Sequence, residues 1–166
     1  MTCVVALRHG KKMYMGADSR IVHDNFKFTS NNYPKIIKYD NCAIGYAGNT
    51  TPKRVLESLN PVLRTQKDVY KFTKKLFEKL KELDGDELET ELLICTKKAI
   101  YMADKYLDCF EMGNYWAIGS GSEFALGAME ILNTMGLNPK SQIEEALKTA
   151  SKYCTDVGPP YKVIEV

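Results

Sequence analysis

The chain has 166 residues, of which 45% are hydrophobic and 27% are charged. Both values are those of an ordinary globular protein, and the length suits a single domain with a full core, which we expect to span residues 1–166. The formal net charge is only +2. It creates no overall field that would attract nucleic acid or an anionic membrane, and we expect neither as a partner.

The cysteines are odd in number and widely spaced, and none forms a CxxC pair: Cys3, Cys42, Cys95, Cys109 and Cys154. This pattern favours reduced thiols over disulfides or a zinc site. The first ten residues carry no basic segment ahead of their short apolar run, which also falls short of the roughly 20 residues of a membrane span. We therefore expect a cytoplasmic protein.

The first third of the chain predicts strands. Apolar, partly β-branched runs separated by turns are expected to pair as two hairpins, residues 2–7 with 13–17 and residues 35–39 with 42–48. Between these hairpins, the polar stretch 19–33 contains two shorter strand-like segments, around Ile21 and Phe26. This part of the chain therefore supplies strands only.

Two helices are expected next. Thr51 can cap a first helix with Pro52 at its first position. A second helix begins near Gln66, since apolar residues recur from Val69 to Leu83 at three- and four-residue spacing. Glutamates are interleaved with the lysines of this helix, so its basic face is interpreted as a solvated surface rather than a binding patch.

The second half repeats this order. Short apolar runs predict four strands, at residues 92–95, 99–102, 106–110 and 115–118. A helix through Phe124 to Met135 follows, a further helix starts at Asn138-Pro139, and residues 161–166 predict a last strand. Runs of strands followed by helix pairs indicate α+β layers rather than alternating βαβ units.

A short sequence that occurs twice in the chain supports this interpretation. Ala43-Ile44-Gly45 and Ala117-Ile118-Gly119 both end apolar strands, and each leads through small residues toward a helix. Two sheets that each feed a helix pair suit a four-layer α-β-β-α sandwich, which is the fold we expect.

Thr2 is the first candidate for chemistry. If Met1 is removed, Thr2 carries both a hydroxyl nucleophile and an α-amine that can act as its base. The unperturbed pKa of such an amine is roughly 7.7–8.0, which is close to the pH at which a general base works best. Many chains begin Met-Thr, so the value of this pair depends on the other residues.

Gly119-Ser120-Gly121-Ser122 is the sharpest local motif. It lacks the third glycine of a dinucleotide fingerprint, the lysine of a P-loop and the spacing of a nucleophile elbow. Considered alone, Ser120 with Glu123 is best explained as a capping box at a helix start. The segment Gly45 to Asn49 offers backbone N–H groups that could stabilise an oxyanion, although an ordinary tight turn has the same sequence.

Asp18 and Lys35 lie at the end of one expected strand and the start of another. A lysine near an N-terminal amine disfavours protonation of that amine, and an aspartate beside the lysine would keep the lysine charged and in place. Each residue alone is more simply a surface charge.

Together these features resemble the proteasome β-subunit family of N-terminal nucleophile hydrolases, and within it the HslV type. The resemblance covers nearly the whole chain, and its closest stretch runs from Ala117 to Ala125. It implies an amide-hydrolysing threonine peptidase, with these catalytic residues: Thr2 as nucleophile and base, Lys35 lowering the pKa of the amine, Asp18 orienting Lys35, Gly48 donating to the oxyanion, and Ser120 holding the amine and a water.

The resemblance also implies a substrate site and leaves a metal site open. Ile21, Tyr46 and Asn49 fall near positions that would bind substrate, which suggests apolar substrate side chains. No cofactor is required, but a monovalent cation held by backbone carbonyls near Cys154 is an expectation of the HslV type. The proteasome proper has an aspartate and a serine where this chain has Tyr153 and Asp156, so that part of the charge network differs.

Members of this family form stacked homo-oligomeric rings, act on polypeptides and often receive them from a hexameric AAA+ unfoldase. The resemblance implies such partners here. Two alternatives stay open. A catalytically silent ring subunit would retain Met1, and a small-molecule amidohydrolase could use the same fold.

Overall fold

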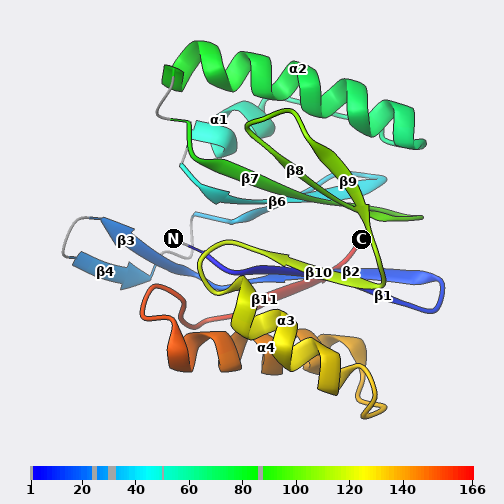
Figure 1. The fold of residues 1–166 in the computed structure, drawn as a ribbon, viewed down its shortest axis with the longest axis vertical. Helices are drawn as coiled ribbons and strands as arrows, with labels where there is room; N and C mark the ends of the chain where they lie inside the picture. The colour runs from blue at the N-terminus through cyan, green and yellow to red at the C-terminus, as the bar shows by residue number, and fades with distance from the viewer. Residues whose placement is uncertain (1, 24–25, 30–32, 50, 86–87) are drawn as a thin grey trace.

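The computed structural model describes residues 2–23, 26–29, 33–49, 51–85 and 88–166. Met1, which we expect to be removed so that the amine of Thr2 is free, lies outside the described residues. Figure 1 shows four layers, with one helix pair above two stacked sheets and a second helix pair below them. The predicted α-β-β-α sandwich is confirmed.

The lower sheet contains the first strand. Its strands lie in the order β10-β1-β2-β11 and comprise β1 (Val4–His9), β2 (Lys12–Ala17), β10 (Tyr115–Ile118) and β11 (Lys162–Glu165). Helices α3 (Ser122–Leu132) and α4 (Pro139–Tyr153) cover its outer face. Residues 4–7 are fully buried, because β1 is a central strand covered on both faces. This explains its continuous apolar run.

The upper sheet has the strand order β5-β6-β7-β8-β9. Its strands are β5 (Ile36–Lys38), β6 (Cys42–Gly48), β7 (Thr90–Thr96), β8 (Ile100–Asp104) and β9 (Cys109–Met112). Helices α1 (Thr51–Glu57) and α2 (Gln66–Asp84) cover this sheet. A capping box between Thr65 and Asp68 starts α2, and its buried face carries Val69, Leu76 and Leu80.

Side-chain alternation divides the core into layers. In β6, Cys42, Ile44 and Tyr46 pack with the residues of α1 and α2, whereas Ala43 and Ala47 pack between the two sheets. A third cluster lies between the lower sheet and helices α3 and α4. This period of two decides which residues of each strand can face the other sheet.

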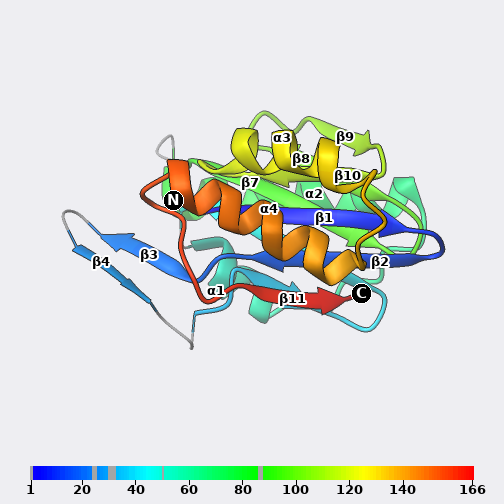
Figure 2. The same ribbon diagram turned by 90° about the horizontal axis from the view of Figure 1, so that it is seen from below.

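A separate hairpin leaves the end of β2. Strands β3 (Arg20–His23) and β4 (Phe26–Thr29) pair with each other and extend to one side of the sandwich in both ribbon views (Figures 1 and 2). The two short strand segments predicted between residues 19 and 33 are therefore confirmed.

Three details differ from the sequence analysis. Gly121, not Ser120, is the N-cap of α3, and no side-chain hydrogen bond caps this helix, so the predicted capping box is wrong. The strand expected at residues 106–110 begins only at Cys109, since Asp104 N donates to Asp108 O and closes a turn. Thr51 is itself the first residue of α1, and its hydroxyl donates to Asp84 Oδ1 (2.8 Å).

Among the helices of the described ranges, none combines the length and apolar character needed to cross a bilayer.

Candidate active site

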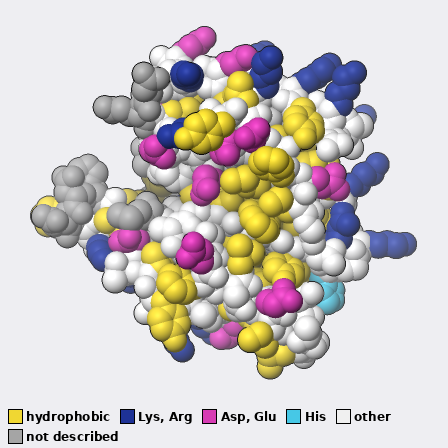
Figure 3. Space-filling view, in the orientation of Figure 1, with side chains coloured by type: hydrophobic (Ala, Val, Ile, Leu, Met, Phe, Trp, Pro, Cys, Tyr) yellow, Lys and Arg dark blue, Asp and Glu magenta, His cyan; other side chains and the backbone are white. Residues whose placement is uncertain are grey.

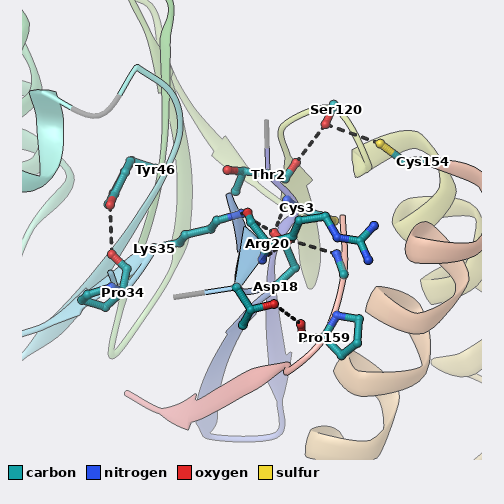
Figure 4. Close-up of polar contacts among 12 residues, drawn as sticks. Thr2, Cys3, Asp18, Arg20, Pro34, Lys35, Tyr46, Ser120, Cys154 and Pro159 are labelled. Atoms are coloured by element: carbon teal, nitrogen blue, oxygen red, sulfur yellow. Dashed lines mark hydrogen bonds and ion pairs between the residues drawn. The ribbon is translucent and has the colours of Figure 1, made fainter. Parts of the chain in front are cut away.

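Thr2 lies directly before β1, between the two sheets, and is 5% exposed. Its carbonyl oxygen accepts hydrogen bonds from Ser120 Oγ (3.4 Å) and Gly121 N (3.4 Å). The Gly-Ser-Gly segment therefore holds the backbone of Thr2 (Figure 4). Ser120 Oγ thus contacts the carbonyl oxygen of Thr2, and its expected role at the amine of Thr2 stays a prediction.

Asp18 ends β2 and is 2% exposed. Its Oδ1 accepts from Cys3 N (3.0 Å) and Lys35 Nζ (2.8 Å), and its Oδ2 accepts from Arg20 N (3.0 Å) and Gly158 N (3.1 Å). A buried carboxylate needs this many donors to offset its desolvation. Asp18 thus connects the start of β1, the lysine and the loop after α4.

Lys35 precedes β5 and is 6% exposed. Its Nζ donates to Asp18 Oδ1 (2.8 Å) and to Arg20 O (2.6 Å), and Figure 4 shows the side chain reaching to the space between Thr2 and Asp18. Burial lowers the pKa of Lys35, and the neighbouring Asp18 carboxylate opposes this change. The predicted Asp18–Lys35 pair is thus present as a buried ion pair beside Thr2.

Gly48 ends β6 with a φ of 98°, and a Cβ at this position would lie 1.6 Å from Glu89 O. Only glycine fits there. Along β6 the N–H groups point alternately to the two neighbouring strands. Tyr46 N donates to Lys35 O and Asn49 N to Glu89 O, so the Gly48 N–H points away from β7, toward the side on which Lys35 lies.

Gly119 follows β10 with a φ of 89°, and a Cβ here would lie 2.2 Å from Thr2 O. Its N–H donates to Glu91 Oε2 (3.0 Å). Glu91 belongs to β7 of the upper sheet, so this bond joins the two sheets beside Thr2. Sequence reasoning missed Glu91, although a charged residue directly before the apolar run Leu92-Leu93-Ile94-Cys95 was a signal that could have found it.

A cavity of about 460 Å³ adjoins Thr2 on the side of β7 and β8. Its wall includes Ala47, Gly48, Gly119 and Ser120, together with a group of mostly charged residues: Glu89, Glu91, Asp104, Lys105 and Tyr106. Lys105 pairs with Glu89 (2.5 Å). The charged lining therefore has an acidic excess, since three carboxylates face one ammonium.

The three expected substrate-binding residues do not line this cavity. Tyr46 lies on the helix side of β6 and donates its hydroxyl to Pro34 O (2.9 Å), and burial raises the pKa of its phenol. The alternation of β6 turns its side chain toward α1 and α2, so Tyr46 does not line this cavity, and its expected role in substrate binding stays a prediction. Asn49 Nδ2 donates to Asp84 Oδ2 (3.4 Å), and Ile21 is half-buried in β3.

The last residue of α4 and the residues that follow it point in different directions. Cys154 is half-buried, and its thiol donates to Ser120 Oγ (3.5 Å). Tyr153 is largely exposed and stacks on Phe124, with ring centroids 5.5 Å apart. Asp156 pairs with Lys27 (3.6 Å). Among the described residues no group of three or more His, Cys, Asp or Glu side chains could hold a metal ion.

A four-layer sandwich with a threonine at the start of its first strand has the fold of the N-terminal nucleophile hydrolases of the proteasome β-subunit and HslV type. No protein-family model matches the sequence, and no curated protein matches it. The similarity to known proteins is therefore found by comparing structures.

BPH of Thiobacillus denitrificans has a TM-score of 0.87 and 23% identity, over 99% of this chain and 97% of that one, in structures alone and in complex with epoxomicin. Eukaryotic HslV from Trypanosoma brucei has a TM-score of 0.75 and 20% identity, over 98% of both chains. Anbu, the ancestral β-subunit from Yersinia bercovieri, has a TM-score of 0.77 and 13% identity, over 98% of this chain and 80% of that one. At such identities these similarities establish the fold.

Proposed function

We propose that this chain is an N-terminal threonine peptidase in which Thr2, freed by removal of Met1, is the nucleophile. One observation carries the proposal. The buried ion pair of Lys35 and Asp18 lies beside Thr2, where a structural role alone does not explain it, since a buried ion pair contributes little net stability.

The proposed reaction begins with the α-amine of Thr2, which takes the proton of Oγ as Oγ attacks the substrate carbonyl carbon. The Gly48 N–H donates to the oxyanion that forms. The tetrahedral intermediate collapses, the amide C–N bond breaks, and the amine of Thr2 returns its proton to the leaving nitrogen. Water then hydrolyses the acyl-enzyme, with the same amine as base.

Lys35 acts on the amine through its charge. A nearby ammonium disfavours protonation of the Thr2 amine, so more of the amine is free base at neutral pH. Asp18 holds the ammonium of Lys35 in place and, through Cys3 N, also orients the residue that follows Thr2. Asp18 therefore fixes the position of the Lys35 ammonium relative to Thr2, because it is hydrogen-bonded both to Lys35 and to the residue after Thr2.

We propose polypeptides as substrates, a homo-oligomeric ring as the working form, and an AAA+ unfoldase as a partner of the ring. Apolar side chains gather over the middle of the face shown in Figure 3, and Tyr106, Leu107 and Phe110 in the β8–β9 region are large and exposed. A monomer rarely exposes such a surface without a partner. The basic side chains along the upper edge of this view are those of an ordinary solvent-exposed surface.

The test is the intact mass of the native protein before and after incubation with epoxomicin, the compound bound to the structurally similar BPH. We expect loss of Met1, one adduct on the wild type, hydrolysis of unfolded polypeptides, and neither adduct nor hydrolysis for Thr2→Ala. Retained Met1 with no adduct and no turnover would contradict the proposal and favour a silent ring subunit.

The role of Lys35 is tested by the pH dependence of kcat/KM. Replacing it in Lys35→Met removes a positive charge, so the pKa of the Thr2 amine rises and the acidic limb of the profile moves to higher pH. Lys38→Met is the matched control, since Lys38 is exposed on β5 and its Nζ donates to the backbone carbonyl of Glu165 (2.6 Å). An unmoved limb in Lys35→Met would remove Lys35 from the mechanism.

A further inference from the structure

The loop that follows α4 reaches back to the candidate active site. Gly158 N donates to Asp18 Oδ2 (3.1 Å), and Gly158 O accepts from Ser19 N (3.1 Å). The position of this loop therefore decides whether Asp18 keeps one of its four donors. Whatever holds the loop also holds the Asp18–Lys35 pair.

Two cationic side chains from the β3–β4 hairpin meet at this loop. Arg20 Nη1 donates to Thr155 O (2.7 Å), and Lys27 Nζ donates to the same oxygen (3.3 Å). The guanidinium of Arg20 also lies against Gly158, where a Cβ would come within 2.4 Å of Arg20 Cζ. Figure 4 shows the Arg20 side chain extending toward this part of the chain. The loop is thus already packed against a positive charge.

These contacts bear on the expectation of a monovalent cation held by backbone carbonyls near Cys154. A carbonyl oxygen has two lone pairs, and both side-chain cations donate to Thr155 O. A further cation at the same oxygen would compete for its lone pairs and be repelled by Arg20 and by Lys27, although Asp156 (3.6 Å from Lys27 Nζ) offsets part of the Lys27 charge. The donor set around Thr155 therefore does not fit an added ion.

The backbone of Arg20 lies in the site itself. Arg20 N donates to Asp18 Oδ2 (3.0 Å), and Arg20 O accepts from Lys35 Nζ (2.6 Å). One residue thus contacts both members of the buried pair through its backbone and the loop after α4 through its side chain. Its positive charge also helps to lower the pKa of Lys35.

We propose that Arg20 serves as a built-in cation that holds the Cys154–Pro160 loop in place of a bound monovalent ion, and so positions the Asp18–Lys35 pair. Arg20 is a positioning residue, since it acts through Asp18 and Lys35. The consequence for activity rests on the proposed peptidase function, whereas the consequence for the loop does not.

The first test uses the wild-type protein and needs no activity. The Tm is measured at constant ionic strength while Na⁺ or K⁺ is replaced by N-methylglucamine, a cation too large for a carbonyl cage. We expect the same Tm in all three salts. A saturable rise of Tm with Na⁺ or K⁺ would overturn the proposal, because it would show that the protein binds the ion.

The second test compares Arg20→Gln with Arg20→Lys. Loss of a charge-assisted hydrogen bond should lower kcat/KM for the glutamine variant by roughly tenfold, and guanidinium well below its denaturing range should restore part of the rate and of the Tm. The lysine variant should stay closer to wild type. Lys148→Ala, which breaks an exposed pair with Glu145 on α4, is the control and should match the wild type.

Absence of rescue by guanidinium, or equal losses in Arg20→Gln and Arg20→Lys, would show that the side chain only fills space. If the glutamine variant does not fold, the lysine variant and the wild-type salt series still decide the question. If the wild type neither hydrolyses peptides nor reacts with epoxomicin, the proposed function fails, while the Tm measurements still test the role of Arg20.

Discussion

Two strand-to-helix turns flank Thr2, and each places a glycine at a positive φ for a different purpose. Gly48 ends β6 and Gly119 follows β10, with φ values of 98° and 89°, and both line the cavity next to Thr2. In each turn a Cβ would meet a carbonyl oxygen, that of Glu89 or that of Thr2. Neither turn could be built with another residue without moving its neighbours.

The difference lies in the N–H groups. The N–H of Gly119 donates to Glu91 on the other sheet, so this turn joins the two sheets beside Thr2. The N–H of Gly48 points away from β7 to the side of Lys35, so it is directed to where we propose the oxyanion forms. One turn positions Thr2 and the other directs a backbone donor, and substitutions in the two should have separable effects.

The largest effect is expected for Gly48→Ala. The new Cβ would lie 1.6 Å from Glu89 O, so the end of β6 must shift, and a displacement of about 1 Å can lower a rate roughly 100-fold. We expect a lower Tm and at least this loss in kcat, measured with a fluorogenic peptide. The control is Gly113→Ala, where no atom lies within 4 Å of the new Cβ. Unchanged kcat in Gly48→Ala would contradict the assigned role of this turn.

A smaller effect is expected at Glu91. In Glu91→Ala the Gly119 N–H loses its acceptor from the other sheet, which should lower the free energy of unfolding by about 1–3 kcal/mol. Glu91→Gln keeps an acceptor oxygen and should lose less. Urea unfolding of both variants measures this. Equal losses in the two variants would show that the hydrogen bond does not matter.

Ser120→Ala should have a modest effect on stability. The bond from Ser120 Oγ to Thr2 O is long, at 3.4 Å, so its loss should cost less than about 1 kcal/mol. If kcat falls several times further than the small loss of stability accounts for, the hydroxyl has a further role at the amine of Thr2. Comparison of kcat with the free energy of unfolding separates the two roles.

The smallest effect concerns the reactivity of the five cysteine thiols. Burial raises the pKa of Cys42 to about 11 and that of Cys95 to about 12, and it also raises the pKa values of Cys3 and Cys109. Raised pKa values mean little thiolate at pH 8, so these thiols should not react with iodoacetamide. Half-buried Cys154, next to Ser120, should give one adduct by intact mass. Two or more adducts on the folded protein would contradict this burial.

Sequence reasoning predicted the layered fold well, because each predicted strand or helix had a local signal. The apolar runs of β1 and β2, the turn at Gly10 and the stripe of α2 are all visible in neighbouring residues. The structure also brings Asp18 and Lys35 together beside Thr2, although their catalytic roles stay a prediction.

The remaining site features depend on contacts between distant segments. Tyr46 was expected at the substrate, but the position of Pro34 and the side on which α1 and α2 pack decide where it points. Glu91 and Arg20 reach partners 28 and 135 residues away. No pattern among neighbouring residues predicts contacts between segments so far apart in the sequence. Ser120 matched a capping box in spacing, yet the approach of Thr2 gave its hydroxyl a different partner.

The four donors around Asp18 also bear on how the protein folds. They come from Cys3, Arg20, Lys35 and Gly158, and the last of these is 140 residues from Asp18 in sequence. Closing such long loops is slow, because the chain entropy is lost before the contact is gained. The carboxylate therefore obtains its full set of partners only when nearly the whole chain has folded. A nascent chain synthesised only as far as residue 156 would lack the Gly158 donor, so the carboxylate that holds Lys35 beside Thr2 would still be incompletely hydrogen-bonded.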